Sequence, residues 1–186
     1  MDEDEDSPAF VFPKGSLDEN EHLLQWVGFQ RGAVLRNCAG LSDEQGRWRP
    51  DGKLICVTAI LNHLTLMERR WVDGGFRGVE ATYEPESEFH PEGLTLAEAL
   101  AAYRARAAAT DAFVRSASLD TVSPESSWGR GHDLRFVVLH ILGETARLAY
   151  HLHWPLDSIL DLEHRDRRRF LEEAQGLAAM YPGPAE

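Results

Sequence analysis

The sequence predicts an all-α protein. It should form a four-helix bundle with a long connection between the second and third helices and an accessory helix near the C-terminal end. Three observations predict this fold. Apolar residues recur at helical spacing in four stretches of the 186 residues, no stretch alternates over the length of a strand, and three Ser/Thr-x-x-Glu/Gln patterns mark helix starts. A chain of this length suits one domain.

The N-terminal region predicts an acidic flexible arm and then the first helix. Residues 1–15 hold five acidic residues with two prolines and a glycine, which leaves little apolar surface to bury. The capping pattern Ser16-Leu17-Asp18-Glu19 predicts the helix start, and Gly40 suits its C-terminal end. The apolar stripe of this helix consists of Leu23, Val27, Val34 and Cys38.

A short turn and the second helix follow. Ser42-Asp43-Glu44-Gln45 repeats the capping pattern, but Gly46, Pro50 and Gly52 follow so closely that it predicts a single helical turn. The second helix is expected from about Leu54 to Trp71, where Gly74-Gly75 then ends it. Its stripe of Cys56, Ile60, His63 and Met67 places His63 on the buried side.

The connection from 74 to 93 is rich in helix breakers and acids. It holds four glycines, two prolines and five glutamates without periodicity. A gap of this length is typical of a long crossover or an active-site loop. Thr95-Leu96-Ala97-Glu98 then predicts the start of the third helix, which should end near Leu119. Its apolar side carries Leu100, Tyr103, Ala107 and Val114.

The fourth helix carries ionisable residues on its apolar face. Asp133 can cap its start, and Pro155 should end or kink it. A helix turns about 100° per residue, so His140, Glu144 and His151 share a face with Val137, Ile141 and Leu148. A further helical pattern at 163–180 predicts the accessory helix. The expected organisation is therefore an arm over 1–15, the bundle over 16–160, and the accessory helix and tail over 161–186.

Composition restricts the classes of partner. The formal charge of -12 and the lack of a long basic stripe disfavour nucleic acid and anionic membranes. No apolar stretch approaches the about 20 residues of a membrane helix, and the acidic start differs from a signal peptide, so a cytoplasmic protein is expected. Cys38 and Cys56, the two cysteines, form no Cys-x-x-Cys motif and predict neither a disulfide framework nor a cysteine zinc site.

His63 and Glu144 are the centre of the predicted chemistry. A catalytic zinc or similar ion takes three protein ligands, often imidazoles with a carboxylate, and keeps one position open. His63 with Glu144 and a histidine of the fourth helix meet that requirement. Two alternatives stay open: His63 can be a hydrogen-bonded core histidine, and Glu144 can form a structural ion pair with Arg147, Arg69 or a histidine.

Several motifs resemble the DinB-like superfamily over residues 17 to 160, most of all a branch of bacterial domains related to mycothiol- and bacillithiol-dependent transferases. The residues that carry the resemblance are Trp26-x3-Gln30-Arg31, Gly40-Leu41-Ser42-Asp43-Glu44-Gln45, His63-Leu64-x3-Glu68-x2-Trp71 and Leu134-Arg135-Phe136-x3-His140-x3-Glu144-Thr145-Ala146-Arg147-x3-His151. The resemblance implies a four-helix bundle whose second and fourth helices bind a divalent metal, often zinc or nickel. It also implies transferases or isomerases that use mycothiol, bacillithiol or glutathione.

The resemblance implies an incomplete ligand set in this chain. Its helix-two histidine corresponds to His63 and its first helix-four ligand to Glu144, but Leu148 stands where the family keeps a second histidine. An isobutyl group cannot coordinate metal. His151, about 10 Å further along the helix on nearly the same face, is the preferred third ligand, and His140 is the fallback.

Two functional hypotheses follow. The first is a divalent-metal-dependent thiol S-transferase for a small-molecule substrate, with zinc or nickel at His63, Glu144 and His151 and a low-molecular-weight thiol as cosubstrate. In it, Arg147 and Arg69 hold a substrate carboxylate through bidentate hydrogen bonds. The second is a metal-free DinB-like module that binds a small molecule without catalysis. Both leave open whether the chain forms a homodimer.

Overall fold

The structure is a computed structural model that describes residues 12–15, 18–49 and 55–151, with the side chains of all of these except residues 150 and 151. The predicted accessory helix and most of the acidic arm lie outside these ranges. The start of the first helix as predicted, Ser16-Leu17, lies outside them as well.

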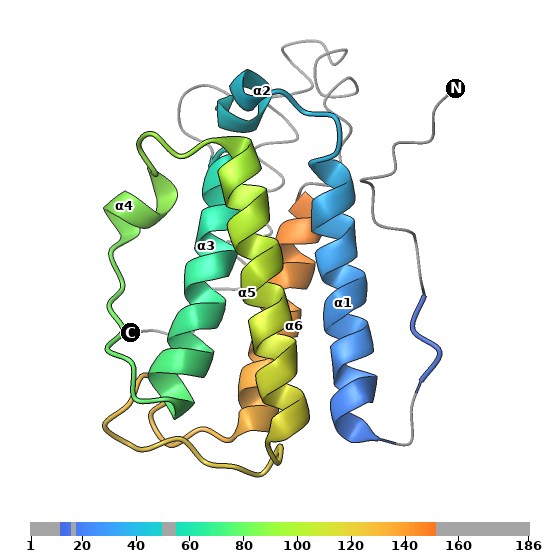
Figure 1. The fold of residues 1–186 in the computed structure, drawn as a ribbon, viewed down its shortest axis with the longest axis vertical. Coiled ribbons are helices and arrows are strands. Elements are labelled where there is room, and N and C mark those ends of the chain that lie inside the picture. Colours follow the sequence, from blue (N-terminus) through green and yellow to red (C-terminus); the bar gives the residue numbers. More distant parts are fainter. Residues whose placement is uncertain (1–11, 16–17, 50–54, 152–186) are drawn as a thin grey trace, which may run out of the picture. The chain divides into compact units, whose positions relative to one another are not determined.

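The part of the chain that the structure describes is all-α, as the sequence predicts. It contains six α-helices and one π-helical turn, and no β-strand, only an isolated bridge between Val122 and Asp133. Figure 1 shows the four longest helices running lengthwise beside one another. None of the described helices is both long and apolar enough to span a membrane. In chain order the elements are α1 Glu19–Asn37, α2 Asp43–Arg47, α3 Val57–Arg69, η2 Arg70–Gly74, α4 Pro85–Phe89, α5 Leu96–Ser116 and α6 Leu134–His151.

Side-chain caps set most of the helix starts. Thr95 and Ser42 form capping boxes with Glu98 and Gln45 at the starts of α5 and α2, as the sequence predicts. Asp133 Oδ1 accepts from the backbone nitrogen of Phe136 at 2.7 Å at the start of α6. At α1 the capping residue is Asp18, whose Oδ1 accepts from the backbone nitrogen of Glu21 at 3.0 Å.

The core lies between the four long helices. The predicted apolar stripes largely supply it, although Leu23, Leu100 and Ala107 are only half-buried. Burying each such side chain stabilises the fold by about 1.5–3 kcal/mol. The fully buried side chains include Val27 and Val34 of α1, Leu61 and Leu64 of α3, Tyr103 and Val114 of α5, and Val137 and Ile141 of α6.

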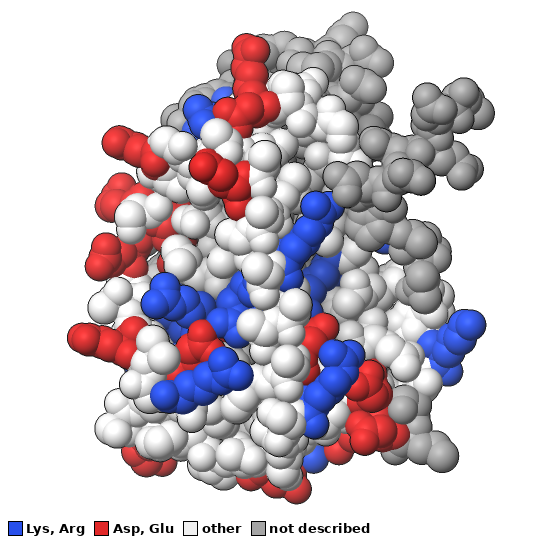
Figure 2. Space-filling view, viewed as in Figure 1, with Lys and Arg blue, Asp and Glu red and all other residues white. Residues whose placement is uncertain are grey.

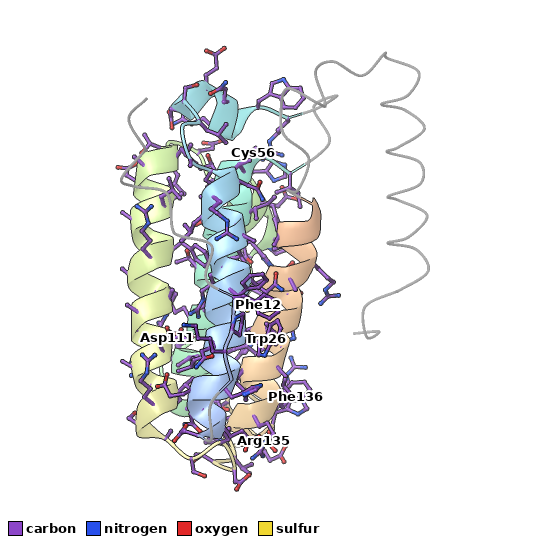
Figure 3. All side chains as sticks on the ribbon, turned by 90° about the vertical axis from the view of Figure 1, so that its right-hand side faces the viewer. Phe12, Trp26, Cys56, Asp111, Arg135 and Phe136 are labelled. Atoms are coloured by element: carbon purple, nitrogen blue, oxygen red, sulfur yellow. The ribbon has the colours of Figure 1, made fainter. Side chains whose placement is uncertain are left out.

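A buried ion network joins α1, α3 and α5. Arg31 of α1 donates from Nε and Nη2 to the two carboxylate oxygens of Glu68 on α3, at 3.0 and 2.8 Å. Its Nη1 donates to Asp111 of α5 at 2.6 Å, and Figure 3 labels Asp111 on α5 beside α1. Arg31 is 4% exposed and Glu68 is fully buried. Arg31, which pairs with both Glu68 and Asp111, therefore links α1 to α3 and α5. Arg31 and Glu68 both belong to the motifs that carry the family resemblance.

The long connection between α3 and α5 carries the short helix α4, which the sequence does not predict. Pro85 stands at its first turn, where its missing N–H removes no helical hydrogen bond. Figure 2 shows acidic side chains along the edge of the molecule that carries α4, next to arginine side chains. This edge borders the site described below.

Candidate functional site

His63 lies between two carboxylates. Its Nδ1 is 2.6 Å from Oε1 of Glu88 on α4, and its Nε2 is 3.3 Å from Oε1 of Glu144 on α6. The side chains of His63, Glu88 and Glu144 are 12%, 1% and 24% exposed. The site therefore opens to solvent at Glu144 and is closed at Glu88.

Helix α4 packs directly on the His63 side of α3. The ring of Phe89 stacks on the imidazole of His63, with centroids 4.9 Å apart and an interplanar angle of 23°. Asn62 Nδ2 donates to the backbone oxygen of Glu88 at 2.8 Å. Asn62 and His63, successive residues of α3, thus contact the backbone of Glu88 and the ring of Phe89. These contacts orient the Glu88 carboxylate towards the imidazole.

Arg70 holds Glu88 from the other side. Its Nη1 and Nη2 donate to the two oxygens of Glu88 at 2.5 and 2.9 Å, the fork geometry that suits a carboxylate. The guanidinium carbon lies over the rings of Tyr83 and Trp128, 4.9 and 5.5 Å from their centroids. Arg70 begins the π-helical turn η2, and such turns are frequent at functional sites.

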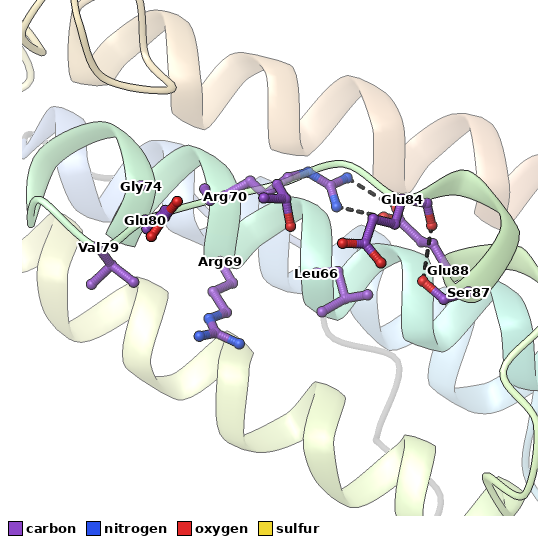
Figure 4. Close-up of a pocket in the computed structure, with 11 residues that line it drawn as sticks. Leu66, Arg69, Arg70, Gly74, Val79, Glu80, Glu84, Ser87 and Glu88 are labelled. Atoms are coloured by element: carbon purple, nitrogen blue, oxygen red, sulfur yellow. Dashed lines mark hydrogen bonds and ion pairs between the residues drawn. The ribbon is translucent and has the colours of Figure 1, made fainter.

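A pocket of about 230 Å³ borders the same arginine and glutamate. Figure 4 shows Arg70 reaching Glu88 along this pocket, with Arg69 and Leu66 on the α3 side. The residues of the connection that line the pocket are Val79, Glu80, Ala81, Thr82, Glu84, Ser87 and Glu88. Since Glu88 lines the pocket and also contacts His63, the pocket and the His63 site share a wall.

Charges around His63 favour its protonated form in the metal-free protein. Burial by itself lowers the pKa of His63, but the hydrogen bonds and charges of Glu144 and Glu88 outweigh it and raise the pKa above 6.5. Burial by itself raises the pKa of Glu88, but His63 and Arg70 hold it below 4.5. The hydrogen bond from His63 and the charge of Arg147 hold the pKa of Glu144 below 4.5.

We expect the metal-free protein to lose stability as the pH rises above about 6.5, the unfolded-state pKa of His63. A pKa raised on folding stabilises the folded state fully below the unfolded-state pKa, and that contribution disappears as the pH rises through the folded-state pKa. Because folding lowers the pKa values of Glu88 and Glu144, these two carboxylates stabilise the folded state above pH 4.5. That contribution is lost as the pH falls through their folded-state pKa values. The cluster contributes most between pH 4.5 and 6.5.

Urea unfolding of chelator-treated protein at a series of pH values measures this dependence. The variant His63→Gln should show a weaker decline above pH 6.5 than the wild type. The variant His90→Gln, at an exposed histidine of the same connection, is the matched control. An equal decline in His63→Gln and wild type would contradict the expectation.

The two predicted arginines lie in different surroundings. Arg147 is 63% exposed, and its Nη2 donates to Glu144 Oε2 at 2.7 Å, the ion pair that the sequence left open as an alternative. Arg69 is exposed on the pocket wall and makes no hydrogen bond or ion pair with the described residues. Among the described residues, then, Arg147 has a partner and Arg69 has none.

The candidates for a third ligand lie on α6 on either side of Glu144, with His140 before it and His151 after it. The His140 ring packs on Trp71 with centroids 4.7 Å apart, and burial lowers the pKa of His140. Leu148 is half-buried one turn after Glu144, and His151 is the last residue of α6, with its side chain outside the described part. Among the described side chains no group of three or more His, Cys, Asp or Glu could hold a metal. His63 and Glu144 are the pair that the structure brings together.

Glu88 is a residue of the site that the sequence does not predict. It is one of five glutamates in the connection, and the four others are exposed while Glu88 is 1% exposed. The connection has no periodicity to indicate which glutamate points inward. The one available signal is Pro85, which can begin a helix and places Glu88 and Phe89 at its end.

The comparison with protein families identifies the chain. A family model described as mycothiol-S-transferase matches residues 22–153, which runs from the first turn of α1 to the end of α6 and includes His63, Glu88 and Glu144. No curated protein matches the chain. Because the matched region covers most of the 186 residues and supports the resemblance to the DinB-like superfamily, the chain belongs to the mycothiol S-transferase family.

Proposed function

We propose that this chain is a cytoplasmic divalent-metal-dependent thiol S-transferase with the four-helix bundle of the DinB-like type. The observation that carries the proposal is the meeting of His63 Nε2 and Glu144 Oε1 at 3.3 Å, from residues 81 positions apart on α3 and α6. Membership of the mycothiol S-transferase family supports a low-molecular-weight thiol as cosubstrate. The acceptor is a small molecule.

The donor pair suits zinc or nickel. Both ions take imidazole nitrogen and carboxylate oxygen as ligands. In the proposal His63 and Glu144 supply one of each, and His151 supplies the third ligand in place of Leu148, with His140 as the alternative. A bound ion of this kind lowers the pKa of a coordinated thiol and so supplies a nucleophile at neutral pH.

The arginines bind the substrate in this proposal. Arg69 has no partner among the described residues and lies on the pocket wall, so its guanidinium is available to a carboxylate. Arg147 is exposed at the open side of the site, where its charge also lowers the pKa of Glu144. The deprotonated Glu144 is the form that can coordinate a metal.

Metal analysis of the purified protein tests the proposal. After growth with zinc and nickel, mass spectrometry should find about one ion per chain in the wild type. The variant His63→Ala should lose most of it, whereas His90→Ala, at an exposed histidine, should retain it. A wild-type content below about one tenth of an ion per chain would overturn the metal-dependent proposal.

A metal-free binding module is the second candidate, and two observations favour it. Leu148 occupies the position at which the resemblance implies a metal ligand, and the charges of Glu88 and Glu144 are each balanced by a neighbouring arginine. In that case the wild type would carry no metal. Ligands with a carboxylate should then still raise its melting temperature, and Arg69→Ala should reduce this increase.

A further inference from the structure

The neutral imidazole of His63 has one ring proton for two carboxylate neighbours. A histidine binds a metal through a nitrogen that carries no proton, so the position of this proton decides whether His63 can be a ligand towards α6. A proton on Nδ1 leaves Nε2 free to face Glu144. A proton on Nε2 blocks it.

The two acceptors differ in distance and surroundings. Glu88 Oε1 lies 2.6 Å from Nδ1, whereas Glu144 Oε1 lies 3.3 Å from Nε2, at the long end of the hydrogen-bond range. The Glu88 side chain is 1% exposed and the Glu144 side chain is 24% exposed. Water does not compete for the Glu88 oxygen, while Glu144 is open to solvent and also accepts from Arg147. Because its hydrogen bond is shorter and better shielded from water, Glu88 is the stronger acceptor for the ring proton.

Arg70 makes Glu88 a fixed acceptor. Both carboxylate oxygens of Glu88 accept from Arg70, so the carboxylate is fixed in position and its charge is balanced. The guanidinium lies over the rings of Tyr83 and Trp128, and the backbone oxygen of Glu88 accepts from Asn62. Glu88 therefore contacts the ring of His63 from a position that it cannot leave without breaking several interactions.

We propose that Glu88, clamped by Arg70, is a positioning residue that keeps the proton of neutral His63 on Nδ1 and so leaves Nε2, which faces Glu144 of α6, without a proton. The part of this inference that concerns metal affinity rests on the proposed function. The part that concerns the ring proton depends only on the contacts of the metal-free protein.

The double variant Arg70→Met/Glu88→Leu removes the clamp without leaving a buried charge unpaired. Replacing a buried ion pair by apolar residues of similar size is often neutral or stabilising, so the variant should fold. Only Glu144 then remains as a carboxylate neighbour of the ring, and the proton should move to Nε2. The variant Glu86→Leu changes a 99% exposed glutamate of the same helix and is the matched control.

Nitrogen-15 NMR of the histidine rings reads the proton position directly. The chelated, metal-free protein is measured at a pH high enough that the ring shifts no longer change. The wild type and Glu86→Leu should show His63 with the proton on Nδ1, and the double variant should show it on Nε2. A wild-type proton on Nε2, or a double variant that keeps it on Nδ1, would overturn the proposal.

Metal affinity, measured by competition with a chromophoric chelator, gives the second readout. The double variant should bind zinc about 10–100-fold more weakly than the wild type, the usual effect of losing such an outer partner, and Glu86→Leu should match the wild type. An equal zinc affinity in the wild type and the double variant would overturn the role in metal binding. If the wild type binds no metal but the proton moves as expected, the proposed function fails and the assignment of the proton stands.

Discussion

Replacing Glu68 by alanine is expected to destabilise the protein by about 3–5 kcal/mol, the usual cost of removing one partner from a buried ion pair. Glu68 is fully buried and accepts from Nε and Nη2 of Arg31, which is 4% exposed. Asp111 would still accept from Nη1, but the Nε and Nη2 donors would lose their carboxylate partner inside the protein. Urea unfolding of the metal-free protein at one pH measures the change.

Two further variants separate the effect of the lost ion pair on stability from the effect of the lost side-chain volume. In Arg31→Met/Glu68→Leu apolar side chains replace the buried pair. Asp111 loses its partner, but its side chain is 25% exposed and can bind water, so this variant should recover most of the lost stability. Glu21→Ala breaks the exposed pair between Glu21 and Arg115, and should change the stability far less. A loss below about 1 kcal/mol in Glu68→Ala would show that water reaches Arg31 in solution and would contradict the expected cost.

Local signals explain how much of the fold the sequence could predict. The capping boxes at Ser42 and Thr95 depend on residues three positions apart, so their outcome is decided locally and the prediction is confirmed. The cap at Asp18 and the π-helical turn that begins at Arg70 are not decided locally. Several neighbouring residues could occupy these positions, and tertiary packing selects among them. The helix α4 is too short to show periodicity in a sequence.

The candidate site divides in the same way. Helical periodicity predicts that His63 and Glu144 face inward, because each lies within a long apolar stripe. Glu88 lies in a connection whose path is set by contacts of Glu88 with Asn62 and Arg70 and of Phe89 with His63, rather than by a repeat. The quoted motifs contained Arg31 and Glu68, but their pairing across α1 and α3 is a tertiary contact that sequence spacing does not reveal.

The second large effect is expected for Leu148→His, which should raise zinc affinity by more than about tenfold. Leu148 stands four residues after Glu144 on α6, so a histidine there points along the same face, one turn from the carboxylate. Losing an outer partner of a metal site already costs about 10–100-fold in affinity, and a direct ligand contributes at least as much. Chelator competition on the purified wild type and variant measures the difference.

The control for this change is Leu139→His, which adds the same side chain at an exposed position of α6 on the opposite face from Glu144. It should leave zinc affinity unchanged. An increase confined to Leu148→His would mean that α6 keeps the backbone geometry of a three-ligand site in which leucine replaces one donor. No increase in Leu148→His would mean that the metal site implied by the resemblance lies elsewhere in this chain, because His63 and Glu144 would then fail to bind the ion even when the third donor is supplied.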